Sequence, residues 1–234
     1  SAALRGDDLR PVGHALLELA SQNPTDANAL MDLSLVLQML GDRETALTVQ
    51  GEALALERYF AVLTPKHDAT PEVRVLALMV SGDLMANTPL DCLLGTSGFS
   101  LDMLYVTPED PLPSDIPEHD LLFVAIGESR RTQPILEMFK PYADIWPRPV
   151  LNHPERLQRL SRDQVPQLLA DLPGVAMPPT RRVERGVLEG LAKGDVSISE
   201  ILGEASCFPA IVPRLCDANS SNVQTLVLER SADV

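Results

Sequence analysis

The sequence lacks the features of several large protein classes. Basic side chains are scarce: 19 Lys and Arg against 33 Asp and Glu give a net charge of −14. Binding to nucleic acid or to an anionic membrane needs clustered positive charge, so we expect neither kind of partner. No apolar run approaches the roughly 20 residues of a transmembrane helix. The opening SAALRGDD also lacks the basic and apolar segments of a signal peptide, so we expect none.

Cysteine and histidine are scarce as well. Cys92, Cys207 and Cys216 are far apart and form no C-x-x-C pair, and the four histidines show no metal-ligand spacing. The glycine pattern of a dinucleotide site and the G-x-S-x-G element of hydrolases are also missing. We therefore expect reduced thiols in a cytoplasmic protein, with no metal site and no assignable catalytic residue. A redox or hydrolytic enzyme on a flavodoxin-like sheet is the least favoured interpretation.

Helical periodicity dominates the first 60 residues. After a helix that starts near residue 11, the apolar spacing predicts helices over 29–40 and 43–59. Gly41 lies between these two helices, where a positive φ can end the first of them. The polar segment 63–72, with its two prolines, is typical of a linker. We therefore expect a helical region over 1–62, joined by this linker to a second domain.

Part of this region carries a repeat-like pattern. The residues that form this pattern are Asn23, Pro24, Leu30, Leu33, Gly41, Ala46 and Ala53. They resemble a tetratricopeptide repeat (TPR), although its aromatic positions are missing and only one full repeat is visible. Two interpretations stay open. The helices form a hairpin that packs onto the next domain, or they form a groove that binds a protein or peptide partner.

Beyond the linker, apolar strands alternate with helices. The pattern predicts strands at 73–80, 100–106, 121–126 and 149–152, with helices near 90–94 and 131–142. Continuous apolar strands separated by helices indicate a parallel sheet covered on both faces. The sequence therefore predicts an α/β fold in which 73–152 form a small Rossmann-like domain with a mainly parallel sheet of about four strands.

Polar residues and a glycine follow several of these strands. They are Gly82, Asp83, Asn87, Glu128, Ser129 and Asn152. Parallel strands end at one edge of the sheet, and ligands of open α/β sheets bind there, so these residues are candidates for one ligand site. Their polarity suits an amine or an amino-acid-like ligand. The alternative is that they only form turns and cap helices.

A second resemblance begins at residue 149. PVLN ends a strand with Asn152, and a helix with a charged step at Arg162-Asp163 comes next. GVAMPPT (174–180) reads as a further strand, and CFPAIVPR (207–214) as another. In this order the segments resemble ATP-grasp ligases of the glutathione synthetase-like and D-alanine–D-alanine ligase-like groups. The resemblance implies that Arg214 contacts nucleotide. The TPR-like start, together with GDLMANTP (82–89), GES (127–129) and WPRPVLN (146–152), also resembles bacterial TPR proteins with an ATP-grasp-type C-terminal half.

The match to these ligases is partial. Their glycine-rich phosphate loop and Mg²⁺-binding strands have no counterpart after Arg214, so we expect 153–234 to hold only the start of an ATP-grasp-type subdomain. We therefore expect a non-catalytic binding or interaction module on the substrate-side half of that scaffold, with no cofactor of its own. The alternative is the N-terminal portion of an ATP-dependent carboxylate–amine ligase, which would use ATP and Mg²⁺ on an amino-acid or peptide-like substrate. The sequence leaves a homodimer open.

Overall fold

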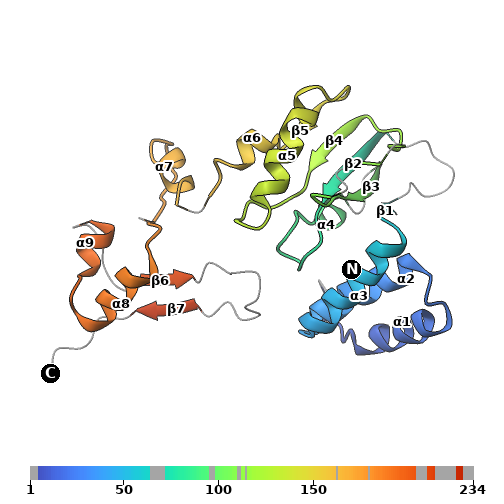
Figure 1. Ribbon diagram of the computed structural model, residues 1–234, viewed down its shortest axis with the longest axis horizontal. Coiled ribbons are helices and arrows are strands. Elements are labelled where there is room, and N and C mark those ends of the chain that lie inside the picture. Colours follow the sequence, from blue (N-terminus) through green and yellow to red (C-terminus); the bar gives the residue numbers. More distant parts are fainter. Residues whose placement is uncertain are drawn as a thin grey trace. The chain divides into compact units, whose positions relative to one another are not determined.

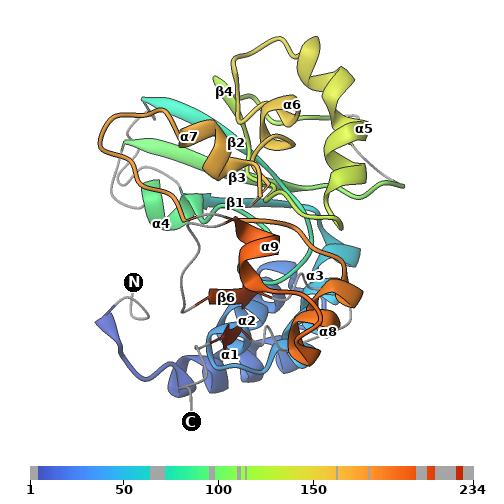
Figure 2. The same cartoon turned by 90° about the vertical axis from the view of Figure 1, so that its left-hand side faces the viewer.

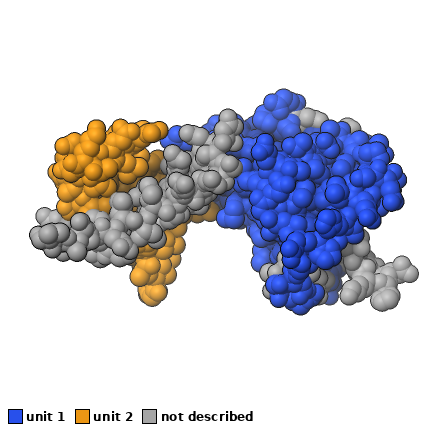
Figure 3. Space-filling model, turned by 90° about the horizontal axis from the view of Figure 1, so that it is seen from below, with its two compact units in different colours: residues 1–158 blue, residues 159–234 orange. Residues whose placement is uncertain are grey.

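The computed structural model divides into two compact units, residues 1–158 and 159–234 (Figure 3). It describes residues 5–63, 72–94, 98–109, 112–113, 115–161, 163–178, 180–203, 210–213 and 225–228. Most of the expected linker and the expected nucleotide contact Arg214 therefore lie outside the described residues.

Three helices open the first unit: α1 (Arg10–Gln22), α2 (Ala27–Met39) and α3 (Arg43–Leu56) (Figure 1). Asp26 and Asp42 precede α2 and α3, and their carboxylates accept the backbone N–H groups of Ala29 and Thr45. These bonds satisfy donors that the first turn of a helix leaves unpaired. Gly41 has a φ of +90°, which ends α2 as the sequence predicts.

The third helix is shorter than predicted. It ends at Leu56, and Tyr59–Leu63 form strand β1 instead of a last helical turn. Glu57 is extended, and its carboxylate accepts the backbone N–H groups of Arg58 and Tyr59, which draws the chain away from the helix. The next residues are aromatic and aliphatic, and these favour a strand. Phe60 then packs edge-on against Tyr105, so its burial in the sheet outweighs the helical periodicity.

A five-stranded mixed sheet fills the rest of this unit. Besides β1 it contains β2 (Val73–Met79), β3 (Phe99–Tyr105), β4 (Leu121–Val124) and β5 (Val150–Leu151), in the order β1-β3-β2-β4-β5. β1 is antiparallel to β3, and the other neighbouring pairs are parallel. The predicted parallel pairing between 73 and 152 is therefore confirmed. The helices among these strands are α4 (Leu90–Leu94), α5 (Gln133–Asp144) and α6 (Pro154–Leu157).

Helices cover both faces of the sheet (Figures 1 and 2). On one face, Ala77 of β2 shares a hydrophobic core with Leu30 and Leu33 of α2. On the other face, the neighbouring strand residue Leu78 shares a core with Phe139 of α5. Successive strand residues point to opposite faces, so the apolar run of β2 fills both cores. The helical hairpin is thus packed onto the sheet, which is the first of the two interpretations that the TPR-like pattern left open.

The second unit is built from short elements: α7 (Val165–Leu169), α8 (Arg185–Lys193), α9 (Ile198–Leu202), β6 (Ala210–Pro213) and β7 (Thr225–Leu228). β6 lies within the strand predicted at 207–214 and pairs antiparallel with β7. The strand predicted at 174–180 is wrong, because 175–178 and Thr180 have no regular secondary structure. Gly174 has a φ of +78° and prolines come after it, and proline cannot donate to a strand ladder. The helices α8 and α9 were not predicted.

Candidate functional site

The strand order creates a switch point between β2 and β4. The chain leaves β2 towards β3 on one side, and β4 lies on the other side of β2. In open α/β sheets, such a point at the carboxyl ends of the strands is the usual place for a ligand. The segments that leave these two ends are 80–89 and 125–132, and five of the six predicted ligand residues belong to them. The sixth, Asn152, follows β5, which lies beyond β4.

The two segments lie directly against each other. Asn87 forms an isolated antiparallel bridge with Ile126. The backbone N–H of Thr88 donates to the carbonyl of Ala125 over 2.7 Å, and that of Gly127 donates to the carbonyl of Ala86 over 2.8 Å. Backbone hydrogen bonds therefore join the two segments at the switch point, between the carboxyl ends of β2 and β4.

Asn87 uses its side-chain amide within its own loop. Its Nδ2 donates to the carbonyl of Val80 over 2.7 Å, and its Oδ1 accepts the N–H of Val80 over 2.9 Å. Both functions of the amide are thus engaged with the last residue before the loop. This contact closes the loop at its base, which is the turn-forming role that the sequence left open.

Gly82 is held from α3. Its N–H donates to Oε1 of Gln50 over 2.8 Å, and its carbonyl accepts from Nε2 of Gln50 over 3.1 Å. A Cβ at position 82 would lie 2.7 Å from the Cβ of Ala86, and its φ of +154° is one that side chains rarely adopt. Only glycine fits this position. Gln50 itself is buried, so the two hydrogen bonds satisfy polar groups that water does not reach.

Asp83 is also held from α3. Its Oδ2 accepts from Nε and Nη2 of Arg43 over 3.1 and 2.9 Å, and its Oδ1 accepts the N–H of Met85 over 3.0 Å. Neither of the helix partners, Arg43 and Gln50, was predicted from the sequence. The signal for Gln50 was its position on the face of the predicted helix that carries Ala46 and Ala53. A polar residue on such a face needs a partner.

The segment after β4 leads into α5. The hydroxyl of Ser129 bonds that of Thr132 over 2.9 Å, and Thr132 also donates to the carbonyl of Gly127 over 2.6 Å. These bonds build the turn before the helix. Glu128 is half-buried, and the structure records no hydrogen bond or ion pair between its side chain and any described residue. Its carboxylate is therefore available to a ligand.

Asn152 has a different environment. Asn152 is exposed. Among the described residues it is the one non-glycine residue with a φ in the left-handed region, at +55°. Its neighbour His153 caps α6 and pairs through Nε2 with Asp144 over 3.2 Å. Asn152 therefore marks the turn from β5 into α6. The structure records no hydrogen bond or ion pair that joins it to the described segment after β2.

The tip of the loop after β2 is apolar and exposed. Leu84 is 44% exposed and Met85 is 83% exposed. Glu128 comes directly after Gly127, where an added Cβ would lie 3.4 Å from the carbonyl oxygen of Met85. The described residues thus combine, at the switch point, a loop fixed by three side chains, an exposed apolar tip and an unpaired carboxylate.

Two hollows are found elsewhere in the first unit, and none of the six predicted residues lines them. One, of about 510 Å³, lies at the end of α3, and the other, of about 340 Å³, lies beside His119 and Trp146. Nε2 of His119 accepts from the Trp146 indole over 2.9 Å, and Nδ1 bonds the carbonyl of Pro117 over 2.7 Å. Within the described ranges there is no cluster of three or more potential metal ligands, and no helix has the length and apolar character needed to cross a membrane.

Comparison with known proteins gives no family. No family model, no curated protein and no solved structure matches the chain.

Proposed function

We propose that the chain is a non-catalytic binding module that recognises a peptide segment of a protein partner at the switch point between β2 and β4. One observation carries this proposal: the loop after β2 is fixed at its base and flanks, while Leu84 and Met85 at its tip are exposed. Among the described residues, Met85 is the most exposed of the large apolar side chains.

The fixed loop favours binding for an entropic reason. Ordering a flexible loop on binding costs free energy, and that cost is small where the loop is already held. Here Gln50, Arg43 and Asn87 each contribute hydrogen bonds to it. The tip residue Met85 adapts to different partners, because its thioether side chain is unbranched and polarizable. The arrangement therefore combines a fixed backbone with an adaptable contact.

Charge indicates the chemistry of the partner. Residues 1–158 contain 23 acidic and 11 basic side chains, a net charge of −12. Glu128 adds an unpaired carboxylate beside the apolar tip, although the exposed Arg130 and Arg131 come next in the same turn. Electrostatic attraction of a partner therefore comes mainly from the net negative charge of residues 1–158 as a whole. We expect a partner segment that carries apolar side chains and a net positive charge.

The ligase alternative rests on the resemblance of 149–180 and 207–214 alone. It would require ATP and Mg²⁺, and Arg214, the expected nucleotide contact, lies outside the described residues. Calorimetry with Mg²⁺-ATP separates the two proposals. A binding module gives no heat of binding, whereas Mg²⁺-dependent binding that Arg214→Ala abolishes would favour the ligase.

Selection from a random peptide library tests the proposed partner. We expect the selected peptides to be enriched in apolar and basic residues. Their affinity should fall at least about tenfold, or about 1.4 kcal/mol, in a Leu84→Ser/Met85→Ser variant. The matched control is Leu17→Ser/Leu19→Ser, which removes two exposed leucines of α1. Equal loss in both variants, or no loss in the first, would refute the proposed site.

A further inference from the structure

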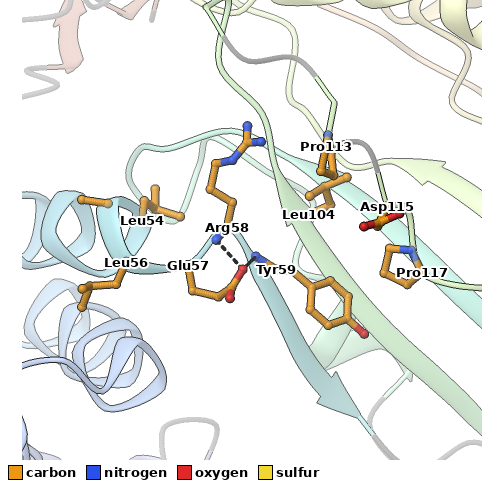
Figure 4. A pocket seen from close by; sticks show the side chains of 10 residues that line it. Leu54, Leu56, Glu57, Arg58, Tyr59, Leu104, Pro113, Asp115 and Pro117 are labelled. Carbon is orange, nitrogen blue, oxygen red and sulfur yellow. Dashed lines mark hydrogen bonds between the residues drawn. The ribbon is translucent and has the colours of Figure 1, made fainter.

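The hollow at the end of α3 has a lining rich in hydrogen-bond acceptors. Its volume is about 510 Å³, and the residues that line it are Leu54, Ala55, Leu56, Glu57, Arg58, Tyr59, Leu104, Pro113, Asp115 and Pro117 (Figure 4). None of the six predicted ligand residues lines it. What it binds is a separate question from the proposed partner site.

The first set of acceptors is the end of the helix. The last four carbonyls of an α-helix have no partner within the helix. In α3 the carbonyl of Ala53 accepts the N–H of Glu57, and no hydrogen bond from a described residue is recorded to the carbonyls of Leu54, Ala55 or Leu56. These three residues form one wall of the hollow. The helix dipole adds partial negative charge at the same end.

Carboxylates form the second set. Oε1 of Glu57 accepts the backbone N–H groups of Arg58 and Tyr59 over 3.0 and 3.1 Å, and no described residue bonds its Oε2. Asp115 contributes a carboxylate from the segment after β3, and it too has no recorded partner among the described residues. Glu57 and Asp115 are 58 positions apart in the sequence, so the fold brings their charges to one hollow.

The remaining lining is apolar or already engaged. Tyr59 contributes its ring and Leu104 its side chain, and Pro113 and Pro117 contribute a rigid apolar wall. Burial, followed by the neighbouring Asp102 carboxylate, raises the pKa of Tyr59 to about 12, so the phenol stays neutral. Arg58 is the basic residue of the lining, but its side chain extends away from the Glu57 carboxylate in Figure 4 and has an interaction of its own.

We infer that this hollow binds a protonated amine on a short apolar chain, with the ammonium group at the helix end between Glu57 and Asp115. An ammonium group has three donors and no acceptor, which suits carbonyl and carboxylate oxygens. Its methylene chain suits the prolines and the tyrosine ring, whose face also attracts cations. Two sources share this chemistry: the lysine side chain of a peptide and a free diamine.

The test is an NMR titration of the full chain, followed through the backbone amides of Arg58 and Tyr59. The probes are lysine with both ends capped, 1,4-diaminobutane, and capped norleucine as the uncharged analogue of lysine. We expect saturable shifts with at least one of the two amines and none with norleucine. A response to capped lysine alone assigns a peptide ligand, and a response to the diamine alone assigns a free amine.

Charge-removing variants locate the site. Glu57→Gln keeps an oxygen that can accept the two backbone N–H groups, and Asp115→Asn keeps the shape of its side chain. Each should weaken amine binding about fivefold, the effect of one close charge at the protein surface. Glu52→Gln makes the same change at an exposed position of α3 outside the lining, and it should leave binding unchanged. Shifts with norleucine equal to those with lysine, or wild-type affinity in both lining variants, would overturn the assignment.

Discussion

Gln50 and Gly82, 32 residues apart, exchange two hydrogen bonds through which α3 holds the loop after β2. The amide of Gln50 imitates a backbone peptide group, since it donates to the carbonyl of Gly82 and accepts from its N–H. Both residues are buried, so neither group has water as an alternative partner. This relationship fixes the loop whose tip we propose as the binding surface.

Gln50→Leu should therefore destabilise the protein. The substitution leaves the N–H and carbonyl of Gly82 buried without partners, and we expect the free energy of unfolding to fall by about 1–3 kcal/mol. Urea denaturation measures the change. Gln22→Leu, at the exposed end of α1, is the matched control and should change stability little. A stability loss no larger than that of the control would mean that water replaces the lost partner.

Replacing glycine with alanine should change stability in opposite directions at positions 82 and 51. Gly82→Ala places a Cβ 2.7 Å from that of Ala86 at an unfavourable φ, and it should destabilise by about 1–3 kcal/mol. Gly51 lies within α3, and a Cβ added there would meet no atom within 4 Å. Gly51→Ala should therefore stabilise by about 0.5–1 kcal/mol, because alanine is the better helix former. Thermal unfolding of the two variants checks both signs, and the same sign in both would contradict the described loop.

Gln38 contrasts with Gln50 on the neighbouring helix. Both polar atoms of its amide are buried without a hydrogen-bond partner among the described residues, as is the hydroxyl of Ser34 one turn earlier. Replacing such a group with an apolar one of similar shape removes a desolvation cost. Gln38→Met should thus raise the free energy of unfolding by about 1 kcal/mol. Gln22→Met at a solvent-exposed position is the comparison, and destabilisation by Gln38→Met would indicate a water or ligand bound to that amide.

The ion pair between Arg74 and Asp120 predicts a dependence of stability on pH. Hydrogen bonds from the side chain and the backbone N–H of Arg74 lower the pKa of Asp120. A carboxylate with a lowered pKa in the folded state stabilises that state above its unfolded pKa of about 4, and this contribution is lost as the pH falls further. At pH 7, Asp120→Asn should therefore be less stable than the wild type.

The difference in unfolding free energy between the wild type and Asp120→Asn should narrow as the pH falls below about 4. Chemical denaturation of both at a series of pH values measures it. Asp115→Asn is the control, since Asp115 has no recorded partner among the described residues. A difference between wild type and Asp120→Asn that stays constant down to low pH would show that the carboxylate charge is not its source.

Much of the fold could be predicted from hydrophobic periodicity, because buried residues recur at regular intervals within a single helix or strand. The helices at α1 and α2 and the strands β2, β3 and β4 were all predicted from apolar spacing. The end of α3 was wrong because burial of Phe60 against Tyr105 depends on a strand about 40 residues away in the chain. The strand at 174–180 was predicted from the resemblance to ATP-grasp ligases, and this prediction was wrong. The two prolines of the segment cannot donate hydrogen bonds to a strand ladder.

The candidate site was predicted less completely than the fold. Strand ends identified the loops after β2 and β4, because topology alone places the ends of parallel strands at one edge. The roles of Asp83 and Gly82 depend on Arg43 and Gln50, which belong to a helix on the other side of the linker. Local sequence carries no information on such pairing. The exposed tip at Met85 was also missed, because an apolar residue in a loop does not reveal its exposure.

Methyl NMR of the methionines reports on the proposed binding surface at Leu84 and Met85. The chain has seven methionines, and a Met85→Leu variant identifies the signal of Met85. The probe is a short capped peptide of alternating leucine and lysine, with alternating leucine and glutamate as the control of opposite charge. We predict that the basic peptide shifts the Met85 signal saturably while that of Met39, 46% exposed at the end of α2, stays in place. A shift of Met39 without Met85 would assign binding to the helical hairpin instead and contradict the proposed site.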